Sequence, residues 1–549
     1  MKKLLVLIVF FLAKGIYAQG VYTNVSDPVY DYLQKVSSKL ELDYSGLVRP
    51  KLRTDIAGQL LKIDSLKVVL NKTEIEELNW YIEEYAGECK LLTKEKPLSN
   101  LKIITGRKRT YSFDDSYFKL NVSPILGYAV TSQYNSLVRK SIVGLNLFSS
   151  IGDNWGFFFN FADNSETGNK LDSAKRFTKE TGTIIKALTV NNMQYSEARG
   201  AVTYSDKSIT LSMGKDWMNW GSGYNSRLIL SDKAPSFPFI KLDIHPVEWF
   251  HFYYYHGWLN SRIDDTNRTY AALTKAPDSS VVQRKVEREK YIAAHILEVT
   301  LTRGVKLSLG ESLIYSDGNP KLGFFIPVVF FRLVDHYYEG SDGSARGGNA
   351  QLFSDLNISY WKNYNFFITS FIDEFSMSQF LKGETGRNQL GFTIGGSVYE
   401  PAGINNLTLR TEYTGILPWV YSNFIQTQTY TSSDYLLGHY IGQNSSQIFL
   451  QADYKYNAQL GFRLSGDITK NGGFGDINNQ YKNIQEPFLY APVRSETNIG
   501  LEVIYEPVHE LYSKLKIVST KISDNDKNRT PLYQIGSFVN IYASLQYGL

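Results

Sequence analysis

The chain has 549 residues and a formal net charge of +4, which is too mild to indicate a nucleic-acid partner. Its one cysteine, Cys89, excludes an internal disulfide framework. Tyrosine is abundant, with 39 residues, yet no apolar run beyond the N-terminus approaches the ~20 residues of a membrane-spanning helix. If the chain crosses a membrane, it must therefore form a closed β-barrel, a structure whose interfaces are rich in aromatic residues.

The N-terminus has the pattern of a secretory signal. Lys2 and Lys3 precede an apolar run from Leu4 to Ala13, which at about ten residues is too short to span a bilayer. Ile16-Tyr17-Ala18 then supplies a small residue at a plausible cleavage point. We expect residues 1–18 to be a signal peptide, and the alternative of a short buried helix is weaker.

Residues 19–105 are expected to form a small helical domain and a linker. Apolar residues recur with a helical period after Asp27-Pro28 and again after Thr54. The run Thr73-Glu74-Ile75-Glu76 has the pattern of a capping box that opens a third helix. The charged stretch around Lys90 to Lys96 is interpreted as the linker.

From about residue 117 the hydrophobic period changes to two, which is typical of strands with one apolar face. The last strand, 536–549, carries its apolar residues at alternate positions, namely Val539, Ile541, Ala543, Leu545, Tyr547 and Leu549. The strands of a soluble β-sandwich would also alternate between apolar and polar residues. The loop lengths must therefore distinguish a sandwich from a membrane barrel.

Loop lengths favour an all-β transmembrane barrel over residues 106–549. Long polar loops and tight turns alternate between about eighteen antiparallel strands, an even number as in bacterial barrels. The predicted strands are 117–130, 141–152, 154–163, 197–205, 208–214, 238–243, 248–258, 292–302, 305–315, 351–360, 364–375, 389–399, 405–414, 446–456, 459–468, 498–506, 511–520 and 536–549. Both ends of the barrel fall on the short-turn side, which predicts a periplasmic helical domain.

Charged residues on the polar faces, such as Arg410 and Glu412, are predicted to point into the lumen. The favoured interpretation is a mixed-charge lumen whose ion pairs hold the wall together, and the alternative is a path or site for a charged ligand. Glu311 breaks the pattern because it falls in a lipid-facing series, where a carboxylate is costly. It lies either near the interface or, as we prefer, beside a bulge at Gly310 that turns it inward.

Two long loops have unusual compositions. Loop 215–237 contains Trp217, Trp220, Tyr224 and Arg227, a combination that suits sugar rings but also ordinary girdle or plug packing. Segment 316–350 is long and partly apolar, so it is expected to fold into the lumen or to contribute extra strands.

Eight segments carry motifs whose order and spacing are informative: 27–33, Arg49-Pro50, 73–85, 213–221, 228–235, Leu309-Gly310-Glu311, Phe371-Ile372-Asp373-Glu374 and 437–442. Together they resemble the Wzi family of capsule-assembly outer-membrane proteins. The resemblance implies an eighteen-stranded barrel with a periplasmic helical bundle and a lectin-like role in holding capsular polysaccharide at the cell surface. It transfers no polysaccharide-binding residue, so the candidate glycan or lumen residues come from the patterns above and from these segments: Trp217, Trp220, Tyr224, Arg227, Asp232, Glu311, Asp373, Arg410 and Glu412.

The expected function is surface attachment or assembly of capsular or extracellular polysaccharide, without catalysis. The alternative is an outer-membrane diffusion channel or glycan export pore. An enzyme is least favoured, because no metal-binding or nucleophile motif is present and His251 and His256 fall on opposite faces of one strand. No catalytic residue, metal or cofactor is therefore expected. The expected partners are the polysaccharide, outer-membrane lipid and the barrel-assembly machinery during biogenesis, with periplasmic export machinery as a further candidate and no nucleic acid.

Overall fold

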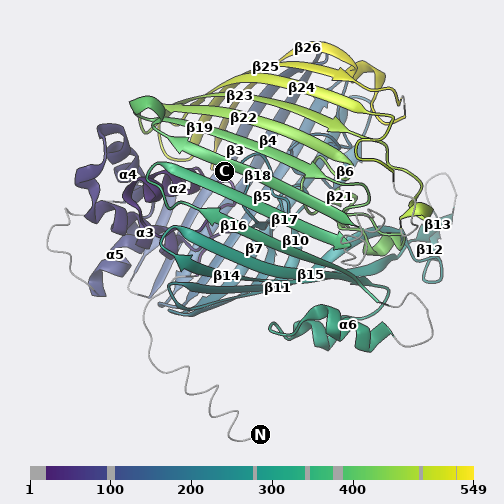
Figure 1. The fold of residues 1–549 in the computed structure, drawn as a ribbon, viewed down its shortest axis with the longest axis horizontal. Helices are drawn as coiled ribbons and strands as arrows, with labels where there is room; N and C mark the ends of the chain where they lie inside the picture. The colour runs from purple at the N-terminus through teal and green to yellow at the C-terminus, as the bar shows by residue number, and fades with distance from the viewer. Residues whose placement is uncertain are drawn as a thin grey trace, which may run out of the picture.

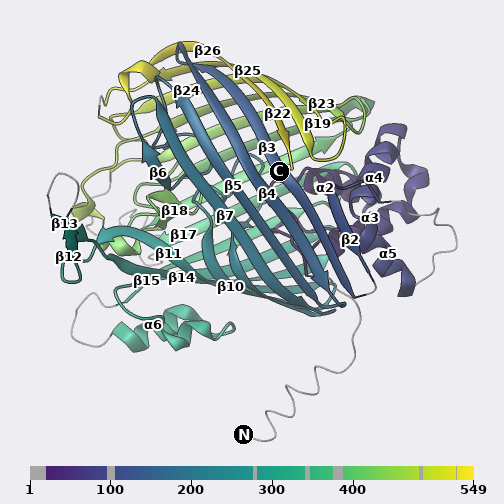
Figure 2. The same ribbon diagram turned by 180° about the vertical axis from the view of Figure 1, so that it is seen from behind.

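Eighteen long antiparallel strands close into a barrel, as predicted. The computed structural model describes residues 20–95, 106–115, 117–275, 281–339, 347–374, 388–480, 486–526 and 528–548. The expected signal peptide, residues 96–105 and Leu549 lie outside the described residues, whereas Lys90 to Glu95 of the expected linker are described. In Figures 1 and 2 the strands run obliquely around the wall, with a helical domain at one end. We call this the helix end, and the opposite end, where the longer loops gather, the loop end.

The wall closes where β26 pairs with β3, through partners such as Leu545 and Tyr128. In chain order the wall strands are β3 (Phe118–Gln133), β4 (Ser136–Ile151), β5 (Trp155–Gly168), β7 (Asn192–Ser205), β8 (Ile209–Asp216), β10 (Phe237–Val247), β11 (Phe250–Asp264), β14 (Glu287–Thr302), β15 (Val305–Ser316), β16 (Asn349–Ile358), β17 (Tyr364–Glu374), β18 (Gln389–Tyr399), β19 (Leu407–Ile416), β22 (Ser445–Lys455), β23 (Leu460–Asn471), β24 (Arg494–Tyr505), β25 (Leu511–Ser523) and β26 (Gly536–Tyr547). Shorter strands are β2 (Tyr111–Asp114), beside β3, and β6 (Ile185–Leu188), beside β7.

Side chains alternate between the two faces of the wall, as the period of two predicts. On β5, Phe157, Phe159 and Phe161 are exposed on the outside, whereas Asn160 and Asn164 are buried inside. Val539, Ile541 and Leu545 of the last strand are likewise exposed. The outside is therefore an apolar belt and the inside is polar, which is the arrangement of a transmembrane barrel.

The first hairpin departs from the predicted loop pattern. A loop over 131–140 was expected, but β3 and β4 continue to a two-residue turn at Tyr134-Asn135, and both of these residues have positive φ. Such a turn matches the twist of paired strands. The alternation of long and short connections is therefore not strict at this hairpin, although the strand count stands.

The described part of the helical domain, residues 20–95, contains four α-helices rather than three. They are α2 (Val29–Leu40), α3 (Arg53–Ser65), α4 (Lys72–Glu84) and α5 (Ala86–Glu95). The capping box is formed by Asn71 and Glu74, so α4 begins before the predicted box at Thr73. Helix α5 covers a stretch that was interpreted as linker, because Cys89 and Leu91 are buried despite its charged residues. No described helix is both long and apolar enough to pass through a bilayer.

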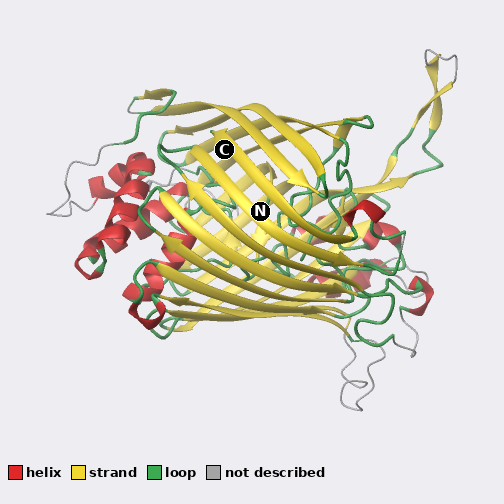
Figure 3. Cartoon of the chain, turned by 90° about the horizontal axis from the view of Figure 1, so that it is seen from above, coloured by secondary structure: helices red, strands yellow, loops and turns green. Residues whose placement is uncertain are grey.

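The helical domain is fixed to the wall and also reaches the interior of the barrel. Lys39 makes ion pairs of 2.9 Å with both Glu74 of its own domain and Glu400 of the wall. The two-residue strand β1 (Val48–Arg49) pairs with β9 (Asn219–Trp220), which belongs to a loop inside the lumen. Figure 3 shows the domain against one end of the barrel. The N-terminal segment is thus part of the packing that fills the lumen.

Residues 321–339, after β15, lie outside the barrel, so the described part of this segment meets neither expectation for 316–350. It contains η2 (Leu322–Phe325) and α6 (Phe331–Glu339), and α6 lies outside the wall in Figures 1 and 2. The prediction of a bulge at Gly310 is also wrong, because β15 pairs without a shift from Leu309 to Leu313 on both sides. Glu311 stays on the outer face and is buried there under this segment. An uncovered charge at the centre of that face would cost about 2–4 kcal/mol, or somewhat less for a carboxylate.

Candidate functional site: a plugged lumen with a large cavity

Two loops from the loop end fold into the lumen and fill one side of it. We call residues 217–236 and 417–444 together the plug. Tyr421 and Tyr430 donate hydrogen bonds from their hydroxyls to the carbonyls of Leu228 (2.5 Å) and Ile229 (3.0 Å). The apolar core of the plug consists of Met218, Trp220, Leu228, Ile229, Leu230, Ala234, Val420, Tyr421, Tyr430, Leu437, Tyr440 and Ile441. A core of this kind excludes water from its part of the lumen.

Carboxylates of the wall bind backbone amides of the plug. Glu412 accepts hydrogen bonds from the backbone N–H groups of Tyr224 (2.9 Å) and Asn225 (2.6 Å). Asp373 accepts one from Tyr421 at 2.7 Å. Charge-assisted bonds of this kind are the strong class of hydrogen bond. The candidates Asp373 and Glu412 therefore hold the plug in place.

Asp355 has the same role and was missed by the sequence analysis. Its carboxylate accepts hydrogen bonds from the backbone N–H of Ser222 at 2.7 Å and from the Ser222 hydroxyl at 2.9 Å. Thr369 donates a further bond at 2.5 Å. The alternation of residues on strand β16 places Asp355 on the inner face. The sequence signal that could have identified it is therefore its position as an inward carboxylate.

Trp220 and Arg227 of the predicted aromatic site are part of the plug core. Trp220 is 1% exposed and packs edge-on against Tyr255, with ring centroids 5.0 Å apart. Arg227 is buried and donates to the carbonyl of Gly221. Burial, together with the Arg49 charge, lowers the pKa of Arg227 to about 10. Neither side chain offers a free face to a sugar.

Of the other predicted residues, Tyr224 and Asp232 lie in the plug and Arg410 lies on wall strand β19. The Tyr224 hydroxyl donates to Asn365 at 2.8 Å. Burial raises the pKa of the Asp232 carboxyl, which lies in the plug. Arg410 pairs with Asp453 on the wall and, at 3.4 Å, with Asp31 of the helical domain. These positions explain why the charges are needed for the fold.

A third loop, between β5 and β6, enters the lumen beside the plug and is fastened by lysines. Lys233 of the plug donates to the carbonyls of Lys175 (2.5 Å), Thr178 (2.8 Å) and Glu180 (2.8 Å). Lys179 of the loop donates to the side-chain oxygen of Asn225 at 2.7 Å. Burial is the main cause that lowers the pKa values of Lys179 and Lys233, each to about 8.

A cavity of about 740 Å³ remains between this loop, the plug and the wall formed by β3–β5, β7 and β22–β26. Its size lies within the range of small-molecule sites, about 300–1,000 Å³. Amide, aromatic and charged side chains line it, including Asn160, Asn164, Asn498, Asn540, Tyr134, Trp217, Tyr440, Tyr542, Lys140, Lys179, Asp467 and Glu496. The lining combines flat apolar rings with many hydrogen-bonding groups of both kinds.

Trp217 is the predicted candidate that reaches this cavity. The guanidinium of Arg199 lies over its ring, 4.1 Å from the centroid. The lining residues Trp217, Arg199 and Thr183 each have one buried polar atom without a hydrogen-bond partner, namely Nε1, Nε and Oγ1. Because these atoms are buried, a ligand in the cavity would first meet the rings and the other polar groups of the lining.

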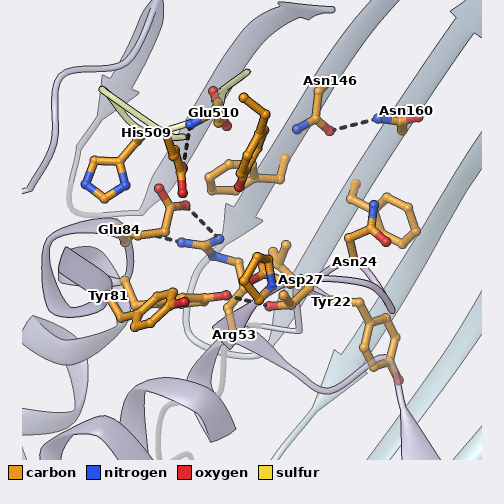
Figure 4. Close-up of a pocket in the computed structure, with 18 of the residues that line it drawn as sticks. Tyr22, Asn24, Asp27, Arg53, Tyr81, Glu84, Asn146, Asn160, His509 and Glu510 are labelled. Atoms are coloured by element: carbon orange, nitrogen blue, oxygen red, sulfur yellow. Dashed lines mark hydrogen bonds and ion pairs between the residues drawn. The ribbon is translucent and has the colours of Figure 1, made fainter. Parts of the chain in front are cut away.

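A smaller cavity of about 120 Å³ lies where the helical domain meets the lumen (Figure 4). Asn24, Asn160 and Arg199 line both cavities, so the two approach each other at these side chains. At the smaller cavity Glu84 pairs with Arg53 at 3.1 Å. Burial raises the pKa of the Glu84 carboxyl, but Arg109, Arg53 and Arg107 outweigh it and hold the pKa well below its usual range.

One group of side chains has the composition of a metal site. Asp243, His245 and His251 each place a potential ligand atom within 4.8 Å of the others, and the rest of the described chain offers no second such group. The charge of Lys51 acts on His251 and opposes a bound cation. The absence of a metal therefore stays a prediction.

The closed wall, apolar belt, plug and helical domain together define a plugged β-barrel membrane protein. The family model for the capsule assembly protein Wzi matches residues 191–511, more than half of the chain. The chain belongs to this family, which confirms the resemblance drawn from its motifs.

Solved structures place the chain in the same fold. Wzi of Escherichia coli, described as a carbohydrate-binding β-barrel involved in group 1 capsule assembly, matches 97% of this chain and 100% of its own. The TM-score is 0.57 at 12% identity, which shows the shared fold. OprD of Pseudomonas aeruginosa is more distant, with a TM-score of 0.39 at 13% identity over 80% of this chain and 97% of its own. No curated protein sequence gives a significant match.

Proposed function

We propose that this barrel attaches or helps to assemble capsular or extracellular polysaccharide at the surface of the outer membrane, without catalysing a reaction. Its family and the carbohydrate binding of the Escherichia coli protein support this function. The observation that carries it for this chain is the cavity beside Trp217, whose flat rings and hydrogen-bonding side chains suit a sugar.

The proposed orientation places the loop end outside the cell and the helix end in the periplasm. Short turns face the periplasm in bacterial barrels, and the helical domain lies beside the short turns of this one. The domain is then positioned to contact periplasmic export machinery. The barrel-assembly machinery remains an expected partner during biogenesis, as for other barrels of this membrane.

The plug favours a tether over the alternative of a diffusion channel or export pore. A barrel of this size would hold an aqueous channel if its lumen were empty. Here the apolar core of the plug fills one side, and the two cavities on the other side are separate, sharing only Asn24, Asn160 and Arg199 in their linings. We therefore expect little conductance from the intact protein.

The test is retention of capsule in cells. A deletion strain should release its polysaccharide into the medium, and the complete gene should restore attachment. Unchanged retention in the deletion strain, together with no binding of the purified protein to the strain's own polysaccharide, would remove the proposal.

A further inference from the structure

The segment between β15 and β16 forms a strap on the outer face of the wall. We call residues 321–339 the outer strap. Its inner side chains Phe324 and Phe331 are completely buried against Leu313, Tyr315 and Tyr254 of the wall. The strap is therefore packed onto the wall as firmly as a core element.

The opposite side of the strap carries several large exposed apolar side chains, beside the exposed His336 and the partly exposed Arg332. Its large exposed side chains are Leu322 (82% exposed), Val328 (76%), Leu333 (67%) and Tyr337 (84%). Large apolar side chains exposed together on one element mark an interaction site rather than a surface in water. The neighbouring wall positions Leu309 and Leu352 are also exposed, so the patch continues the apolar belt of the barrel.

A carboxylate on the wall fastens the strap. Glu311 accepts a hydrogen bond at 2.5 Å from the backbone N–H of Phe331, the first residue of α6. His295 Nε2 lies 3.3 Å from the same carboxylate. Because Glu311 projects from the outer face, the strap must stay in place to keep this carboxylate out of lipid.

Both ends of the strap segment are bonded to the plug. The Thr427 hydroxyl donates to Asp317 at 3.0 Å, just before the strap. The Gln428 side chain donates to the carbonyl of Gly347 at 2.7 Å, just after it. The strap thus connects the outer face of the barrel to the loops that fill its interior.

We propose that the outer strap is a lipid-embedded anchor, held by Glu311, whose Leu322, Val328 and Leu333 side chains lie against lipid acyl chains. Continuity with the apolar belt and the position of Glu311 select lipid as the occupant. With the loop end outside, the leaflet concerned is the outer one.

Spin labelling tests this placement. In a Cys89→Ser background, single cysteines at Val328 and Leu333 are labelled and the protein is reconstituted into phospholipid vesicles. Val143, exposed on the wall, is the lipid control, and Val68, 95% exposed in the helical domain, is the water control. We expect both strap labels to collide with oxygen readily and with a water-soluble nickel chelate rarely, as the label at Val143 does.

Either of two results would overturn the proposal. Strap labels that meet the nickel chelate as often as Val68 would place the strap in water. Labels shielded from both reagents would show that another protein surface, such as a second copy of this chain, covers the strap. Polysaccharide binding does not enter this measurement, so its outcome is independent of the proposed function.

A second variant tests the fastening. Glu311→Ala removes the acceptor for the Phe331 amide. We expect the label at Val328 to become more mobile and its contact with the nickel chelate to rise at least twofold. Unchanged mobility and contact would show that Glu311 does not hold the strap.

Discussion

Glu412 and Asn225 lie 187 positions apart in the chain, yet the carboxylate of the first accepts a 2.6 Å hydrogen bond from the backbone amide of the second. The wall therefore recognises the backbone of the plug loop rather than a charged partner on it. Asp355 and Asp373 repeat this arrangement at Ser222 and Tyr421. These inward carboxylates of the barrel thus hold in place the plug that fills its lumen.

Glu412→Ala should loosen the plug. It removes two charge-assisted hydrogen bonds, each worth about 1.5–3 kcal/mol. We expect intermittent conductance in planar lipid bilayers, where the unaltered protein is silent. Glu502→Ala is the matched control, because Glu502 faces the lumen but pairs with Arg463 of the wall. A steady open channel in the unaltered protein would support the diffusion-channel alternative instead.

Trp220→Ala should destabilise the barrel by removing the largest side chain of the plug core. Truncation of a buried tryptophan costs about 3–5 kcal/mol. Thermal unfolding in detergent, followed by near-ultraviolet circular dichroism, should show a clear fall in Tm. Trp249→Ala, at a side chain that is 55% exposed, is the control and should change Tm little. Equal effects of the two variants would contradict the assignment of Trp220 to a core.

The sequence predicts the barrel well because its physical cause is periodic. Alternation along each strand places Arg410 and Glu412 inside and Leu545 outside, and the structure agrees. The binding partners of the inward charges cannot be predicted in this way. They are backbone amides of loops, and loop sequences have no hydrophobic period. Trp217 and Trp220, only three residues apart, have different environments for the same reason.

The errors have a common origin in contacts between distant segments. Glu311 places a carboxylate in the lipid-facing series of its strand, and a bulge was the simplest local explanation. In the structure the strap covers this carboxylate instead, with helix α6 beginning twenty residues later. Helix α5 was missed because charged residues hide a narrow buried face that includes Cys89.

Glu506, in the turn after β24, gives a pH dependence that can be measured. Burial raises its pKa from 4.5 to about 7, with a further contribution from the Asp27 carboxylate. Between these two values the folded state holds a proton that the unfolded state has lost, so this group's contribution to stability falls as the pH rises from about 4.5 to about 7.

Glu506→Gln should therefore be more stable than the unaltered protein at pH 8, by an amount of the order of 1 kcal/mol, and nearly equal at pH 5. The measurement is Tm in detergent at both pH values. A variant that is less stable at pH 8 would show that the ionised carboxylate is favourable in the turn.

The ion pair between Lys39 and Glu400 should control docking of the helical domain. Its two side chains are 9% and 12% exposed, so Glu400→Ala leaves a poorly hydrated ammonium with one partner fewer. We expect faster proteolytic cleavage within the helical domain of the folded barrel. Glu248→Ala is the control, because its pair with Lys62 also joins domain and wall but is largely exposed. Similar cleavage rates in both variants would contradict this assignment.

The most direct test of a polysaccharide tether is binding of oligosaccharides from the cell's own capsule to the detergent-purified protein, measured by calorimetry. We predict saturable binding that Trp217→Ala weakens at least tenfold, whereas Trp249→Ala leaves it unchanged, because Trp217 lines the lumen cavity and Trp249 does not. Absence of binding, or equal affinity in both variants, would contradict a saccharide site in this cavity.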